Sequence, residues 1–88
     1  MGELIIRSTA IYTLSKVIPA LMIDAAINYM QINKGAKSIV LHPKYADLLK
    51  KKVFQRDYMD FIIDNQKVSL KIVADKQDIL REDQITFS

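Results

Sequence analysis

The most distinctive part of the hydrophobic pattern is a long, almost wholly apolar segment that begins at Pro19 and ends at Lys34. Proline suits the first position of a helix, and Gly35 suits the position just past its end. The few polar residues recur at helical spacing and form one narrow stripe: Asp24, Asn28 and Gln31. The segment therefore predicts a helix over Pro19 to Lys34 that needs apolar cover on both flanks.

A uniformly apolar run follows, from Ser38 to Leu41, and is typical of a strand buried on both faces. His42-Pro43 ends this run and predicts the start of a second helix, with proline again at its first position. One face of that helix is marked by residues at i, i+3, i+4, i+7 and i+8: Tyr45, Leu48, Leu49, Lys52 and Val53.

Beyond Asp57 the pattern changes to a period of two. Alternation over 59–63 and 68–72, around the turn residues Asp64 to Lys67, predicts a β-hairpin whose turn lacks glycine. Residues 85–88 predict a short final strand. We also expect a strand over Glu3 to Arg7.

Ser8 to Lys16 fits either a strand or a helix, and its Thr, Ile and Tyr favour a strand. The order β(β)α–βα–ββ(β) predicts an α+β fold in one domain over 1–88. We expect a mixed sheet of about four to five strands with two helices on one face.

The totals narrow the functional classes. The chain has 88 residues and no cysteine, so it offers neither disulfides nor thiolate metal ligands nor a cysteine nucleophile. The longest apolar run, Val17 to Ile23, is too short to cross a bilayer, and Glu3 near the start does not fit a signal peptide. We therefore expect no membrane association and a cytoplasmic protein, in the host cytoplasm if it is viral.

Charge is distributed unevenly. Residues 1–56 contain nine Lys and Arg against three acids, whereas 57–88 contain four against seven. Such asymmetry favours contact between copies or attraction of an anionic ligand, although an uneven but ordinary surface explains it equally well.

His42 is the first candidate for a site, because it lies where a buried strand meets a helix start. With Lys44 and Lys37 it could bind an anion such as a nucleotide; the alternative, which the position alone favours, is that His42 only caps its helix or packs at the sheet edge. No nucleophile or spaced acid accompanies His42, and two glycines exclude a glycine-rich phosphate loop. We expect a protein that is not an enzyme and that has no metal or cofactor. The acidic residues near the C-terminus, among them Asp75, are interpreted as solvated turns.

A second candidate is the basic cluster formed by Lys50, Lys51, Lys52 and Arg56, which could bind nucleic acid. Such binding favours neighbouring aromatic residues; Tyr58 is near, whereas Phe54 fits the core better. A solvated helix end explains the same lysines and is the favoured interpretation.

The apolar circumference of the long helix predicts a homo-oligomer, a dimer or higher. Left exposed, Met22, Tyr29 and Met30 would form an apolar patch, which a second copy could cover. The alternative is a monomer in which N-terminal strands cover the helix.

One resemblance concerns about the middle half of the chain. A long helix, a glycine, the segment Ile39-Val40-Leu41-His42-Pro43-Lys44-Tyr45-Ala46-Asp47-Leu48-Leu49 and a hairpin follow in that order. This order resembles part of the peripheral domain of tailed-phage major capsid proteins, although the chain is far shorter than such a protein. The resemblance implies a phage or mobile-element origin.

The sequence thus predicts a homo-oligomeric binding module that engages a protein partner or an anionic small ligand such as a nucleotide, as an accessory or regulatory factor. A nucleic-acid-binding protein that uses the lysine-rich second helix is the alternative, followed by a small structural component of a virion.

Overall fold

A computed structural model describes residues 10–88 of the chain. They form one five-stranded sheet in the order β1-β5-β2-β4-β3, with β2 parallel to β4 and every other neighbouring pair antiparallel. The strands are β1 (Tyr12–Thr13), β2 (Ser38–Leu41), β3 (Tyr58–Ile63), β4 (Gln66–Ala74) and β5 (Gln84–Phe87). The helices are α1 (Pro19–Met30) and α2 (Pro43–Leu48), which continues into the π-helical turn η1 (Leu49–Val53). The predicted α+β fold is confirmed.

The N-terminal expectations have two outcomes. The strand expected over Glu3 to Arg7 lies outside the described residues. Within 8–16, the favoured strand interpretation is confirmed at β1, where Tyr12 pairs with Ile85 at one edge of the sheet. None of the helices in residues 10–88 combines the length and the apolar character needed to cross a membrane.

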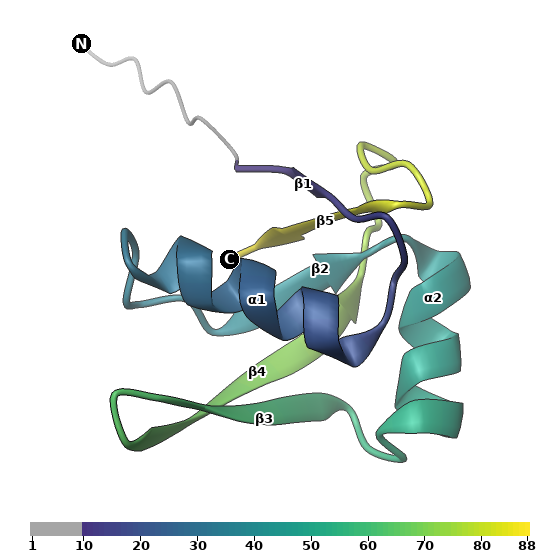
Figure 1. Ribbon diagram of the computed structural model, residues 1–88. Helices are drawn as coiled ribbons and strands as arrows, with labels where there is room; N and C mark the ends of the chain where they lie inside the picture. The colour runs from purple at the N-terminus through teal and green to yellow at the C-terminus, as the bar shows by residue number, and fades with distance from the viewer. Residues whose placement is uncertain (1–9) are drawn as a thin grey trace, which may run out of the picture.

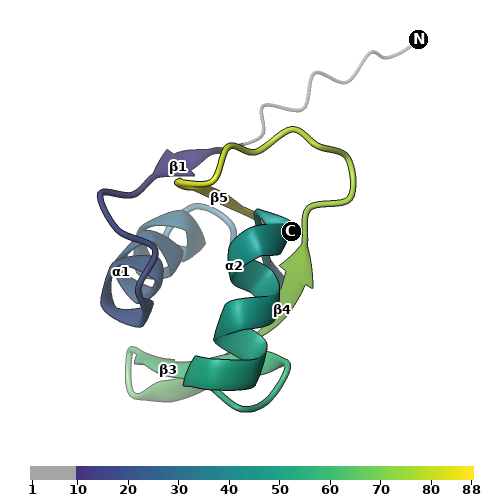
Figure 2. The ribbon, with the colours of Figure 1, turned by 90° about the vertical axis from the view of Figure 1, so that its right-hand side faces the viewer.

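The sheet curls around α1, which explains how so apolar a helix is covered. In Figure 1, α1 lies across the sheet, with β1 and β5 on one side of it and the β3–β4 hairpin on the other. Figure 2 shows the same curl of the sheet after a rotation of 90°, with α2 beside α1 in front of the sheet. Both flanks of α1 therefore meet strands of the same chain.

The core lies between α1 and the concave face of the sheet. Met22, Ala25, Ala26 and Met30 of α1 are buried, and Met22 is 0% exposed. Tyr29 is half-buried and stacks on Phe87 of β5, with ring centroids 4.9 Å apart. The premise that Met22, Tyr29 and Met30 would remain exposed in one chain was therefore wrong, because the curl of the sheet covers them.

The long helix ends earlier than predicted, at Met30 instead of Lys34. The chain leaves it through a side-chain turn in which Asn33 Oδ1 accepts a hydrogen bond from the Gly35 backbone N–H at 3.1 Å. Gly35 does not adopt the left-handed conformation expected of a glycine after a helix. An Asn turn, which competes with helical hydrogen bonding, takes over that role.

The hairpin turn is tighter than the predicted 64–67. Asp64 and Asn65 alone form it, both with positive φ (52° and 64°), and Ile63 pairs with Gln66 directly across it. Two consecutive left-handed residues are the signature of a type I′ turn, and Asp and Asn tolerate that conformation better than most residues. The missing glycine therefore did not prevent a two-residue hairpin.

Candidate functional site

His42 occupies the cap of α2. Its Nδ1 accepts a hydrogen bond from the Lys44 backbone N–H at 3.1 Å, which satisfies one of the free donors at the helix start. The structure thus shows the capping role that the sequence left as the alternative to anion binding. The same ring nitrogen cannot also accept a bond from a ligand.

Lys44 is paired with an acid from the other end of the chain. Its Nζ lies 2.9 Å from Oε1 of Glu82, in the loop before β5. The hydrogen bond from Lys44 and its charge lower the pKa of Glu82, and the same contact raises the pKa of Lys44. The positive charge expected to attract an anion is therefore already neutralised within the chain.

Lys37 lies at the opposite end of β2 from His42. Four strand residues separate them, and a strand rises about 3.3 Å per residue, so the two are on the order of 16 Å apart along β2. The Lys37 carbonyl instead accepts a hydrogen bond from the Lys71 backbone N–H at 3.0 Å. The predicted cluster of His42, Lys44 and Lys37 is not assembled.

A different set of charged residues gathers on the outer side of the β3–β4 hairpin. Met59 and Phe61 are buried on the inner side, so the alternate residues of β3 point outward, opposite their β4 partners. We define the basic face as the connected residues of this outer side: Arg56, Tyr58, Asp60, Lys67, Ser69 and Lys71.

Asp60 organises the basic face. Its Oδ1 accepts a hydrogen bond from the Ser69 hydroxyl at 2.5 Å, and its Oδ2 lies 3.5 Å from both an Arg56 and a Lys67 nitrogen. The Ser69 hydrogen bond is the largest influence that lowers the pKa of Asp60; the charges of Lys67 and Arg56 act in the same direction. One carboxylate thus holds two cations in place and leaves the face with an excess of positive charge.

Arg56 also stacks on an aromatic ring. Its Cζ lies 4.7 Å from the ring centroid of Tyr58, which is 38% exposed, and Lys71 pairs with Tyr58 across the hairpin. The guanidinium and the ring form a planar, cationic and partly exposed surface. The sequence identified Arg56 and noted Tyr58, but it missed Lys67 and Lys71, which only the pairing of β3 with β4 brings to the same face.

The lysine run lies just before this face, on η1. Phe54 N–H donates to the Leu49 carbonyl at 2.8 Å, which closes a π-helical turn, and Lys51 and Lys52 are exposed while Lys50 is half-buried. Phe54 packs against the core, as expected. The run carries no ion pair with Asp or Glu among residues 10–88.

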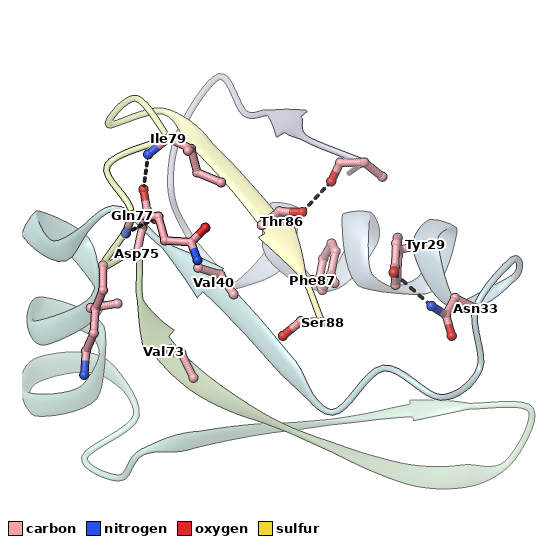
Figure 3. Close-up of a pocket in the computed structure, with 13 residues that line it drawn as sticks. Tyr29, Asn33, Val40, Val73, Asp75, Gln77, Ile79, Thr86, Phe87 and Ser88 are labelled. Atoms are coloured by element: carbon pink, nitrogen blue, oxygen red, sulfur yellow. Dashed lines mark hydrogen bonds between the residues drawn. The ribbon is translucent and has the colours of Figure 1, made fainter. Parts of the chain in front are cut away.

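A groove of about 830 Å³ is drawn in Figure 3. It extends over the carboxyl end of β4, the loop after it and the end of β5. Outward-facing residues of three neighbouring strands, Val40, Val73 and Thr86, line it, together with Ile79 and Asp75 of the loop.

Several polar side chains of the groove bond to the protein itself. Asp75 is buried, and its oxygens accept hydrogen bonds from the Gln77, Ile79 and Leu80 backbone N–H groups at 3.0, 2.9 and 2.8 Å. Burial alone would raise the pKa of Asp75, but these backbone hydrogen bonds outweigh it, so its pKa lies below the ordinary value. The interpretation of Asp75 as part of a solvated turn was wrong, because its carboxylate holds the loop together from inside.

Other donors in the groove are used in the same way. The Thr86 hydroxyl donates to the Ala10 carbonyl at 2.6 Å, and Asn33 donates to the Tyr29 hydroxyl at 3.0 Å (Figure 3). The side chains of Asp75, Thr86 and Asn33 are therefore already bonded within the chain, while Lys76, Gln77 and Ser88 also line the groove. Within 10–88, His, Asp and Glu do not gather in any group of three that could hold a metal ion.

Comparison with known proteins supplies no further guide. No protein-family model matches the chain, and neither does any curated protein or solved structure.

Proposed function

We propose that this chain is a non-enzymatic binding module whose ligand is a single strand of nucleic acid, held on the basic face. The supporting observation is the stack of Arg56 on Tyr58 with Lys71 opposite. Proteins that hold single strands combine cations that contact the backbone with planar side chains on which bases stack, and arginine contributes to both.

The spacing of the cations favours a polymer over a single nucleotide. Lys67 and Lys71 are four residues apart on β4, about 13 Å at the usual rise of a strand. The exposed lysines of η1 precede Arg56 in the chain and extend the positive charge. Cations distributed in this way suit successive phosphates of an extended strand, whereas a mononucleotide would meet only one or two of them.

Two arrangements argue against catalysis in this proposal. The imidazole of His42 accepts from its own helix, and the buried carboxylate of Asp75 accepts from its own loop. Among residues 10–88, no hydrogen bond joins either group to the side chain of a serine, threonine or lysine that could serve as a nucleophile. We propose a cytoplasmic location because the chain has no cysteine, in keeping with a reducing compartment.

The test is fluorescence anisotropy with a labelled oligothymidylate at several salt concentrations. We expect binding at low salt whose affinity falls as salt rises, since each phosphate neutralised on a single strand contributes a slope of about −0.7 in log K against log salt. Lys71→Ala should weaken binding several-fold and reduce the magnitude of the slope by about 0.7.

The matched control is Lys16→Ala, which removes the same charge at a separate hollow that Lys16 shares with Glu82 and Asp83. This variant should bind like the parent. Absence of binding by the parent at low salt would refute the proposal. Equal losses in Lys16→Ala and Lys71→Ala would show attraction by net charge alone, without a site on the basic face.

A protein partner, a virion component and a phage or mobile-element origin stay predictions from the sequence. If a protein partner binds another surface of the chain, Lys71→Ala should still bind oligothymidylate more weakly than the parent does. The test of the basic face is therefore independent of such a partner.

A further inference from the structure

The sheet ends at β3, whose second edge is paired with no other strand of residues 10–88. The Ile72 N–H donates to the Asp57 carbonyl at 2.8 Å, and Ile63 pairs with Gln66 across the two-residue turn. Hydrogen bonding alternates along an antiparallel pair, so the odd-numbered residues of β3 bond to β4. The backbone groups of Tyr58, Asp60 and Ile62 therefore point away from the sheet, along its free edge.

This edge lacks the features that usually prevent pairing. Proteins protect edge strands with lysine, proline, a bulge or a covering segment. Between Tyr58 and Ile63 there is no lysine and no proline, and the register with β4 runs without a bulge. Ile62 is 68% exposed, and the one charge, Asp60, is already balanced by Arg56 and Lys67.

We infer that a second copy of this chain pairs antiparallel with β3 across a two-fold axis. The charges at the two ends of the strand favour this occupant: Arg56 precedes β3 and Asp64 follows it. With Phe61 facing Phe61 of the partner subunit, antiparallel pairing places Asp64 of the partner subunit opposite Tyr58 and diagonally across from Arg56, within reach of the long arginine side chain, and the two-fold axis repeats that contact. The same chain thus supplies both complementary charges.

Apolar side chains are complementary as well. Met59, Phe61 and Ile63 lie on the inner side of β3, and a two-fold axis at Phe61 places this row against its own copy. Asp60 then faces Ile62 of the partner subunit. An axis at Asp60 would instead place two carboxylates directly opposite each other, which is unfavourable. We therefore assign the register in which Phe61 faces Phe61 of the partner subunit.

Pairing through β3 would join two basic faces on the outer side of one continuous sheet. The inference does not depend on nucleic-acid binding, because the association is measured without nucleic acid. Failure of one proposal therefore leaves the other standing.

The experiment is sedimentation equilibrium at micromolar concentration. We expect the parent chain to be a dimer and Ile62→Pro to be a monomer. The N–H of Ile62 points to the free edge, so proline removes an intermolecular donor without breaking a bond to β4, and edge strands accept proline at such positions. Ile62→Thr keeps the N–H and should remain a dimer. Ile32→Ser, which removes an apolar side chain 86% exposed after α1, should also remain a dimer.

Hydrogen exchange of the parent chain tests the same edge without a variant. The amides of Asp60 and Ile62 should become protected as protein concentration rises, whereas the Asn65 amide of the turn should not. A monomer at every concentration, a folded Ile62→Pro that still dimerises, or a dimer in which the Asp60 and Ile62 amides exchange freely would each overturn the inference.

Discussion

Replacing Asp75 should unfold the loop between β4 and β5 at a cost that the structure allows us to work out. Three backbone N–H groups donate to this carboxylate, and that of Leu80 is buried. Leaving the buried donor without an acceptor costs about 1–3 kcal/mol, and each of the two part-buried donors, which water can reach, adds about 0.5–1.5 kcal/mol. Contributions that share one carboxylate do not add fully, so we expect Asp75→Ala to lose about 2–4 kcal/mol.

Asp75→Asn should cost less than Asp75→Ala. The carboxylate Oδ2 accepts two hydrogen bonds, from Ile79 and Leu80, whereas Oδ1 accepts one, from Gln77. An amide can keep its oxygen at the position that serves two donors and lose only the third bond. We expect a loss of about 1–2 kcal/mol, that of one hydrogen bond and of the negative charge.

The same carboxylate predicts a pH dependence. Its pKa is lowered in the folded chain, so the stability it contributes is fully present above the ordinary Asp pKa of about 3.9. That stability is lost as the pH falls from there through the folded pKa. Asp60 and Glu82 also have lowered pKa values and act in the same direction, which is why the comparison with Asp75→Asn is needed. The gap between parent and variant should close in acid.

Urea denaturation followed by circular dichroism at neutral and acid pH measures both effects. The control is Asp83→Ala, which removes an exposed carboxylate from the same loop and should change stability by less than about 0.5 kcal/mol. Equal stability of Asp75→Ala and Asp83→Ala would refute the reasoning. So would a gap between the parent and Asp75→Asn that does not shrink as the pH falls.

Three further predictions concern elements of the fold. Met22→Ala should lower the free energy of unfolding by about 2–5 kcal/mol in urea, since this side chain is fully buried; a loss well under 1 kcal/mol would contradict the placement of α1. Asn65→Gly should be more stable than Asn65→Val by about 1–2 kcal/mol in thermal unfolding, because the turn needs a positive φ; equal stability would count against a type I′ turn. His42→Ala should cost about 0.5–2 kcal/mol and His42→Asn should restore most of it, because asparagine also caps helices; no recovery would argue against the cap.

Local pattern determined most of the elements. Proline at the first helical position identified the starts of α1 and α2, and period-two alternation identified the hairpin, because these signals depend on neighbours in sequence. The predicted ends of the helix and of the hairpin turn were less accurate than the predicted starts. Neither the Asn33 turn after α1 nor the two-residue turn at Asp64 and Asn65 carries the glycine signal that the expectation relied on.

Which side chains are free to bind a ligand depends on contacts between residues far apart in sequence. No local pattern contains those contacts. His42 and Lys44 looked like an anion site until Glu82, far along the chain, was placed beside Lys44. Asp75 looked solvated, although its spacing from Gln77 is that of an Asx turn, a signal that could have been used.

The contacts around α1 also depend partly on local sequence and partly on the tertiary structure. Its sequence determined that α1 needs apolar contacts on nearly every side, because burial of each residue depends on its own side chain and its place on the helix. Whether those contacts come from one chain or from two depends on the curvature of the sheet. Curvature arises from the twist and pairing of all five strands together. Only the tertiary structure could therefore show that β1 and the β3–β4 hairpin close around α1 and leave the edge of β3 free.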